Sequence, residues 1–518
     1  MLKNIKENNQ DDARRLLHCL VVSARPLRVE ELVEILTFDF DAVKGSIPKF
    51  DPDRRPRNPE HAILSICSSL IAIVGNQGSR VVQFSHLSVK EFLTSSHLAF
   101  STELSSYRIL PGPAHTILTQ VCLGLLLQSN NRSHDYSVGV SPLAKYAAQH
   151  WVTHAQFEDV ALRVIDGMEL LFDPDEAHFA AWIDLYDIDA EPGGKVPSER
   201  PSPLYYSALC GFPDLVRHIV VKHPHYVNAI GGSYGFPIVA ALCRNHFQVA
   251  ELLLELGGRV DIRDVREETV LHKTIDRHDH CATGAVRLLL KYGADINAKR
   301  DDLWTPLHLA LHSRKLKAAR ILLNHHANVN ARTNDGQAPL HLLSKWEPCQ
   351  DEDDAPDIAR QLLECGANVN EKDNGNATPL HLASYHQRVE IVRVLLDHGA
   401  NIDMEDDLGK TALQIAIMGN GYDQGDGIGV ARLLLAHGAE EYARDRYPIS
   451  TSDLVCCFGK EKITQVLRGN GDLSETESRW DETFRQWMEG EYYSQECAFQ
   501  VSHIVTRVLR GWKRIQDI

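Results

Sequence analysis

The sequence predicts a mainly α-helical protein whose second half is a solenoid of repeated helix pairs. Two signals, both spaced at 36, 33, 40 and 33 residues, lead to this prediction. The first is a leucine-rich helical segment with its apolar residues on one stripe, and the second is a Thr-Pro-Leu-His motif or a variant of it. The helical segment occurs six times, at residues 249–256, 285–292, 318–325, 358–365, 391–398 and 430–437.

The Thr-Pro-Leu-His motif predicts where each helix pair begins. Threonine suits a helix N-cap, and proline suits the first turn because its missing N–H would have no partner there. The histidine is expected to form hydrogen bonds to the turn, which makes it structural and not catalytic. The intact motifs supply the predicted repeat-start residues, which are Thr305, Pro306, His308, Thr378, Pro379 and His381; His272 and His341 stand in variants.

A glycine follows five of the six helical segments. A helix commonly ends on a residue in the left-handed conformation, which glycine adopts without a Cβ clash. His326 takes this place after the third segment, so the sequence predicts a slightly strained turn there.

The 33-residue base period and the Thr-Pro-Leu-His signal resemble the ankyrin repeat, an α-solenoid with β-hairpin fingers. The resemblance implies about seven or eight repeats over residues 203–470, of which the first two and the last are degenerate. Extra residues fall between the two helices of alternate repeats. They indicate either a binding edge or a place where insertions do least harm, at about 276–284, 346–357 and 418–429.

The first half of the chain predicts a winged helix over residues 11–100. Three helical segments are followed by two β-prone runs, joined by Gly75-Asn76-Gln77-Gly78, and then by a helix near His86. The rest of the expected organisation is a disordered or residual linker at 1–10, a helical spacer at 101–189, a Pro/Gly/Ser-rich linker at 190–202 and C-terminal capping helices at 474–518.

Four segments resemble fungal NACHT-type (STAND) ankyrin-repeat proteins, whose winged helix is often labelled after a GPI inositol-deacylase. These are residues 24–32, 82–93, 146–151 and 178–182. The NTP-hydrolysing domain that the family carries upstream is not found in this chain. In similar nucleotide switches a histidine at the place of His86 contacts the β-phosphate of ADP. Since the nucleotide domain is missing, a helix-start or core role for His86 is preferred here.

Composition and motifs exclude several function classes. The net charge of −16, and the lack of Lys and Arg in residues 59–69, argue against nucleic-acid binding. No apolar run has the roughly 20 residues that a membrane span needs. Eleven cysteines without a Cys-x-x-Cys motif favour a reducing compartment, cytoplasmic or nuclear. No cofactor or metal is expected, because Gly409-Lys410-Thr411, Asp423 with Asp426, and residues 278–281 all lack a complete ligand set.

The predicted function is therefore a non-enzymatic scaffold that binds an unidentified protein through the repeats. Trp304 and Gln337 are candidate contact residues on the finger side, and Trp346, Tyr385 and His386 on the first-helix side. Trp304 could equally pack against the neighbouring finger. The family resemblance implies a sensor or effector-binding part of an NLR-like signalling protein. The alternative is the C-terminal fragment of an ATP-driven switch whose nucleotide domain is missing or supplied in trans.

Overall fold

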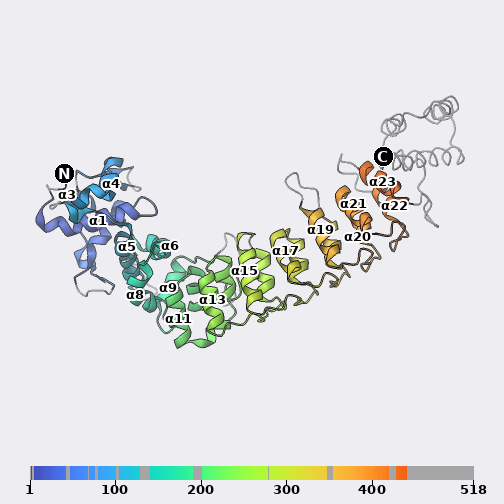
Figure 1. Ribbon diagram of the computed structural model, residues 1–518. Coiled ribbons are helices and arrows are strands. Elements are labelled where there is room, and N and C mark those ends of the chain that lie inside the picture. Colours follow the sequence, from blue (N-terminus) through green and yellow to red (C-terminus); the bar gives the residue numbers. More distant parts are fainter. Residues whose placement is uncertain are drawn as a thin grey trace, which may run out of the picture. The chain divides into compact units, whose positions relative to one another are not determined.

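A computed structural model describes most of residues 2–439 of the 518-residue chain. The chain divides into two compact units, residues 1–262 and 263–518, and each unit is described by itself (Figure 1). The described residues are 2, 5–41, 47–67, 69–75, 80–100, 104–128, 141–190, 201–277, 279–346, 354–418 and 427–439.

The first unit begins with the predicted winged helix. Helices α1 (Gln10–Val22), α2 (Val29–Val33) and α3 (Pro59–Cys67) pack around buried leucine, isoleucine and valine side chains. Strands β3 (Ile71–Val74) and β4 (Val81–Phe84) form the antiparallel hairpin, and α4 (Leu87–Thr94) follows. The backbone at Arg28 bridges Val81, so β4 is covered on its second edge. A further short pair, β1 (Phe38–Asp39) with β2 (Lys49–Phe50), was not predicted.

Helices of the spacer continue the core of the winged helix. The apolar helix α5 (Pro111–Leu126) packs against α1 and against α6 (Ala144–Ala155). The short helices α7 (Val160–Arg163), α8 (Ile165–Leu171) and α9 (His178–Leu185) follow. The indole N–H of Trp182 donates to the carbonyl of Ala148 at 3.0 Å, which attaches α9 to α6.

Two helix pairs complete the first unit at the positions of the two degenerate repeats. They are α10 (Pro203–Cys210) with α11 (Pro213–Lys222), and α12 (Pro237–Cys243) with α13 (Phe247–Glu255). The first helices pack on each other and so do the second helices, as in a solenoid. Ser202 caps α10 by accepting a hydrogen bond from the backbone N–H of Tyr205 at 3.2 Å.

The spacer and the first helix pair share one aromatic core. The ring of Trp151 in α6 stacks on Phe212 with 5.7 Å between centroids, and Trp182 lies edge-on to Tyr206 at 5.9 Å. All four side chains are buried. Residues 191–200 lie outside the described residues, but the two sides of the expected linker at 190–202 do not have separate cores. The spacer thus covers the open end of the repeat stack.

The part of the second unit that the structure describes consists of five helix pairs. In each pair the first helix packs on the first helix of the next pair, and the second helix on the second, which gives two layers (Figure 1). The first helices are α14 (Val270–Arg277), α16 (Pro306–His312), α18 (Pro339–Ser344), α20 (Pro379–Tyr385) and α22 (Ala412–Met418). The second helices are α15 (Asp279–Lys291), α17 (Leu316–Asn324), α19 (Ala355–Glu364), α21 (Val389–Asp397) and α23 (Gly427–Ala436).

Finger-like turns between the pairs are joined by backbone hydrogen bonds from one repeat to the next. The N–H of Asn334 donates to the carbonyl of Asp302 at 3.1 Å, and the N–H of Asn374 to Asp335 at 3.0 Å. Asparagine side chains form a parallel ladder; for example, Oδ1 of Asn330 accepts from the N–H of Asn368 at 2.8 Å. Each repeat therefore provides hydrogen-bond partners for polar groups of the next repeat. This explains why each repeat stacks on the one that follows it in the sequence.

The residues that end the second helices have the conformation predicted from the sequence. Gly293 and Gly399 have φ of 83° and 81°, and His326 has φ of 61° at the equivalent place. A left-handed residue with a Cβ costs roughly 1–2 kcal/mol relative to a right-handed one. The left-handed residue with a Cβ therefore lies at His326, where the sequence predicted it.

Several predicted segments fall wholly or partly outside the described residues. The degenerate last repeat and the capping helices at 474–518 lie entirely outside them, as do most residues of the insertions at 346–357 and 418–429. The insertion at 276–284 is mainly helical, because α15 begins at Asp279 and has 13 residues where α17 has 9.

Candidate functional site

The repeat-start residues form one hydrogen-bonded unit that repeats along the first-helix layer. The backbone N–H of Thr305 donates to Nδ1 of His308 at 3.2 Å, so this nitrogen carries no proton. The opposite nitrogen, Nε2, then donates to the carbonyl of Gln337 in the next finger at 3.1 Å. In the same way, Thr378 donates to His381, and Nε2 of His381 donates to Lys410 at 3.1 Å.

Burial keeps these histidines neutral. Desolvation lowers the pKa of His272 and of His308 from the usual 6.5 to about 4, and it lowers the pKa of His341 and His381 as well. Because both ring nitrogens of each histidine are engaged, none is free to ligate a metal or to act as a base. Thr305, His308, Thr378 and His381 lie in these hydrogen-bonded helix starts, and Pro306 and Pro379 occupy the first turn of α16 and α20.

Trp304 lies directly before the Thr305 cap, with its ring half-buried. The guanidinium of Arg300 lies 5.0 Å from the ring centroid, and the ring of His312 meets it edge-on at 5.0 Å. The carbonyl of Trp304 accepts a hydrogen bond from Nε2 of His272, so its backbone belongs to the repeat-start network. Only part of the indole is therefore available to a partner. The indole of Trp304 thus packs within the repeat and also keeps an exposed part that a partner can contact.

Gln337 lies in the finger before α18, whereas Tyr385 and His386 lie at the end of the first helix α20. Gln337 is half-buried, and its carbonyl accepts from His308. Tyr385, at the end of α20, is 41% exposed, and its ring meets that of His386 edge-on at 5.0 Å. These side chains present polar and aromatic surface next to the finger ribbon.

The exposure expected of Trp346 is wrong, because its side chain is only 8% exposed. The guanidinium of Arg314 lies 5.5 Å from its ring centroid, and Nη1 of the buried Arg388 donates to its carbonyl at 2.8 Å. Trp346 thus joins the repeats on either side of it. A partner does not reach its indole without displacing these groups.

Two residues next to Trp304 were not singled out from the sequence. Arg300 lies in the finger, where it pairs with Asp302 at 2.7 Å and with Glu268 at 3.1 Å. His312 is exposed at the end of α16. Trp304 lies before the Thr305 cap and His312 at the far end of α16, so no helical spacing in the sequence pairs the two rings.

His86 caps helix α4 and is exposed. Its Nδ1 accepts a hydrogen bond from the backbone N–H of Ser88 at 3.1 Å. This geometry is the helix-start role that the sequence favoured.

The described part of the chain carries no cluster of metal ligands. Its His, Cys, Asp and Glu side chains nowhere gather in a group of three that could hold a metal ion. Among the same residues, no helix is both long and apolar enough to cross a membrane. The free thiols of Cys19, Cys122 and Cys210 are fully enclosed, and burial raises the pKa of each.

Comparison with known families agrees with this architecture. The family model described as ankyrin repeats (3 copies) matches residues 278–373 and 349–445. The model described as GPI inositol-deacylase, winged helix domain, matches residues 1–104. Ankyrin repeats and a GPI-inositol-deacylase-like winged helix are therefore present in this chain, and the mainly helical solenoid is its fold.

A curated relative is the azaphilone pigments biosynthesis cluster protein L of Monascus ruber. It is 30% identical over 282 residues, which make up 50% of this chain and 58% of that protein. Solved structures with similarity include the ankyrin repeat domain of Bcl-3, an IkappaB-family member, at 23% identity over 42% of this chain and 94% of that one, with a TM-score of 0.37. The human ASB11 ankyrin repeat domain is 24% identical over 46% of this chain and all of that one, with a TM-score of 0.38.

Proposed function

We propose that the protein is a non-enzymatic scaffold that binds a protein partner through the first-helix layer of its ankyrin repeats. The observation that carries this proposal is the contrast between buried and exposed side chains in the repeats of α16 and α20. The repeat-start residues are buried and hydrogen-bonded, whereas Trp304, His312, Tyr385 and His386 leave aromatic and imidazole surface beside them. Exposed aromatic side chains on a rigid layer are typical anchors of protein interfaces.

Contact residues in this proposal are Trp304, Gln337, Tyr385 and His386, with His312 added. Trp346 does not contact the partner in this proposal. Its buried side chain joins neighbouring repeats. No cofactor, metal or nucleic acid takes part. The compartment is reducing, cytoplasmic or nuclear, and the enclosed free thiols support this part of the proposal because they need no oxidative pairing.

A finer form of the proposal places this chain in NLR-like signalling, as the part that senses a signal or holds an effector. The winged helix supports it, since the same kind of module accompanies nucleotide switches of the NACHT type. The second candidate, a C-terminal part of an ATP-driven switch, rests on His86. Its exposed position at the start of α4 leaves the imidazole edge accessible to a nucleotide domain in trans.

A quantitative capture experiment tests the interaction proposal. Immobilised full-length protein and a Trp304→Ala/Tyr385→Ala variant are compared in extracts of the source organism, with proteins quantified by mass spectrometry. We expect a partner that the wild type enriches and the variant loses by about tenfold, the usual effect of truncating anchor residues. The matched control is Tyr186→Ala, since Tyr186 is similarly exposed, at 39%, but lies in the spacer. Equal enrichment by all three proteins would contradict the proposal.

A further inference from the structure

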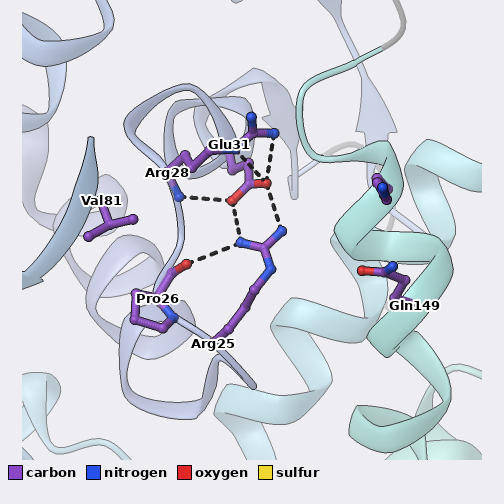
Figure 2. Close-up of a pocket in the computed structure, with 7 residues that line it drawn as sticks. Arg25, Pro26, Arg28, Glu31, Val81 and Gln149 are labelled. Atoms are coloured by element: carbon purple, nitrogen blue, oxygen red, sulfur yellow. Dashed lines mark hydrogen bonds and ion pairs between the residues drawn. The ribbon is translucent and has the colours of Figure 1, made fainter. Parts of the chain in front are cut away.

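A cavity of about 570 Å³ lies beside the segment that leads into α2, within the first unit (Figure 2). Its walls come from the winged helix on one side and from α6 on the other. Its volume falls in the range of sites that hold small organic molecules. The lining residues are Arg25, Pro26, Arg28, Glu31, Val81, Lys145 and Gln149.

The lining carries three cations and one carboxylate. That carboxylate already accepts hydrogen bonds from two of the cations. Glu31 is fully buried, and its two oxygens accept from Nη1 and Nη2 of Arg25, both at 2.8 Å. The backbone N–H and Nε of Arg28 also donate to Glu31, at 2.8 and 3.0 Å. Burial alone would raise the pKa of Glu31, but these hydrogen bonds lower it, so Glu31 is ionised. Two positive charges are left over in the lining.

Arg25 is held in place by the spacer as well as by Glu31. Its guanidinium carbon lies 5.0 Å from the ring centroid of Tyr146 in α6. The backbone N–H of the preceding Ala24 donates to the hydroxyl of Tyr146 at 3.0 Å. Tyr146 is itself fully buried, so the cationic wall is preorganised and loses little side-chain entropy on binding a ligand.

Lys145 and Gln149 face the arginines from α6. They are four residues apart, which places them one helical turn apart on the same side. Figure 2 shows the labelled Gln149 across the cavity from Arg25 and Glu31. Neither side chain has a hydrogen-bond or ion-pair partner among the residues that the structure describes, and Lys145 is exposed. The site therefore has donors that the fold leaves unused.

We propose that this cavity binds a phosphate monoester. The dianion lies between the Arg25 and Arg28 guanidinium groups on one side and Lys145 and Gln149 on the other. Its charge matches the two positive charges that Glu31 leaves uncompensated. Guanidinium groups and lysine are the side chains that best recognise phosphate oxygens. Pro26 and Val81 supply an apolar wall for the carbon group that carries the phosphate.

The source of the phosphate monoester is either a free metabolite or a phosphorylated side chain of a protein. Titration calorimetry of the full-length chain with two probes separates them. Phenyl phosphate represents the free small molecule, and a phosphotyrosine pentapeptide, compared with its unphosphorylated form, represents the protein. Binding of phenyl phosphate alone, or of both with equal affinity, indicates a small-molecule site. Tighter binding of the phosphopeptide indicates a protein ligand.

Variants on α6 test the site without disturbing the buried Arg25–Glu31 pair. Lys145→Gln and Gln149→Leu change side chains that have no described partner, so the melting temperature should stay that of the wild type. Lys145→Gln should weaken probe binding about tenfold or more, the effect of losing one charge-assisted hydrogen bond. The control is Lys222→Gln, which makes the same charge change on the exposed side of α11 and should bind like the wild type.

Two outcomes would overturn the proposal. One is the absence of heat from either probe at millimolar concentration and low salt. The other is binding that Lys145→Gln leaves unchanged, or that Lys222→Gln weakens to the same extent, since the anion would then be attracted to the surface in general. Raised salt should weaken genuine binding, because the charges around the cavity are partly exposed.

Discussion

One histidine in each of four repeats connects that repeat to the next through hydrogen bonds. In four repeat starts the imidazole accepts from the backbone N–H at the helix cap and donates to the next finger. In the fifth, Gln414 stands in this place, and its Oε1 accepts from the N–H of Thr411 at 2.9 Å. Glutamine can therefore replace the acceptor, but it has no titratable proton. This natural substitution separates the hydrogen-bonding role of the histidine from its charge.

The first prediction concerns His308. In the folded chain its pKa is about 4, below the usual 6.5, so between these values the unfolded chain binds a proton that the folded chain does not. Its contribution to stability is fully present above pH 6.5 and is lost as pH falls towards 4. We expect wild-type stability to fall between pH 7.5 and 4.5, and His308→Gln to remove about 2–3 kcal/mol of that fall.

Urea unfolding at the two pH values measures this effect. At pH 7.5, His308→Ala should cost about 2–3 kcal/mol, because it leaves a buried N–H and a buried carbonyl without partners, and His308→Gln should cost less. The control is His312→Ala on the same helix, where the side chain is exposed. A pH dependence that is identical in His308→Gln and in the wild type would contradict this account.

A second residue-scale prediction concerns the strained turn at His326. The equivalent residue in other repeats is glycine, and at Gly399 a Cβ would meet no atom within 4 Å. His326→Gly should therefore stabilise the protein by about 0.5–1 kcal/mol, since relief of the left-handed strain exceeds the entropy that glycine costs. The reciprocal Gly399→His should destabilise it by a similar amount. Denaturant midpoints measure both, and a destabilising His326→Gly would show that the turn is not strained.

At the scale of elements, the spacer helices are the N-terminal cover of the repeat stack. Trp151 and Trp182 are completely buried, and they contact rings on both sides of the expected linker. Two hydroxyls add polar links, since Tyr206 donates to Asp187 at 2.6 Å and Tyr205 to Asp189 at 2.9 Å. A repeat array that begins at residue 200 would expose this aromatic surface. We therefore expect that such an array does not fold stably at its N-terminal end without the spacer.

Trp151→Ala tests this cover. It removes a large buried side chain, so we expect a loss of about 3–5 kcal/mol in the first unit. Hydrogen exchange should speed up in α10 and α11, while α16–α21 keep their protection because repeats transmit stability mainly to neighbours. The half-buried Trp304→Ala is the control and should leave α10 and α11 unchanged. Unaltered exchange in α10 and α11 of the Trp151 variant would show that the spacer does not cover the stack.

The sequence predicted those elements whose signal is local. The repeat starts and the left-handed turns depend on residue types within one turn of the chain, so Thr305, His308 and His326 could be placed correctly. The burial of Trp346 could not be predicted, because it depends on Arg314 and Arg388 from the turns between the helices of the two neighbouring repeats. For the same reason, the aromatic contacts across residues 190–202 and the cavity beside Arg25 were missed. Both arise where segments far apart in the chain meet.

Taken as a whole molecule, the protein combines a winged helix and spacer with a repeat array that has two distinct layers. The second-helix layer carries charged side chains such as Arg393, which pairs with Glu390. The first-helix layer carries the partly exposed aromatic residues and borders the finger ribbon. The Arg393–Glu390 pair is an exposed ion pair of the kind that contributes little energy, because both groups stay solvated. We therefore expect a partner to contact the first-helix layer.

Site-specific photocrosslinking tests this claim most directly. Benzoylphenylalanine is placed at position 385 on the first-helix layer or at position 393 on the second-helix layer of the same repeat. Each protein is then irradiated with the captured partner. We expect a crosslinked product from position 385 and little or none from position 393. Crosslinking from position 393 with none from position 385 would contradict it, because the partner would then lie on the opposite layer.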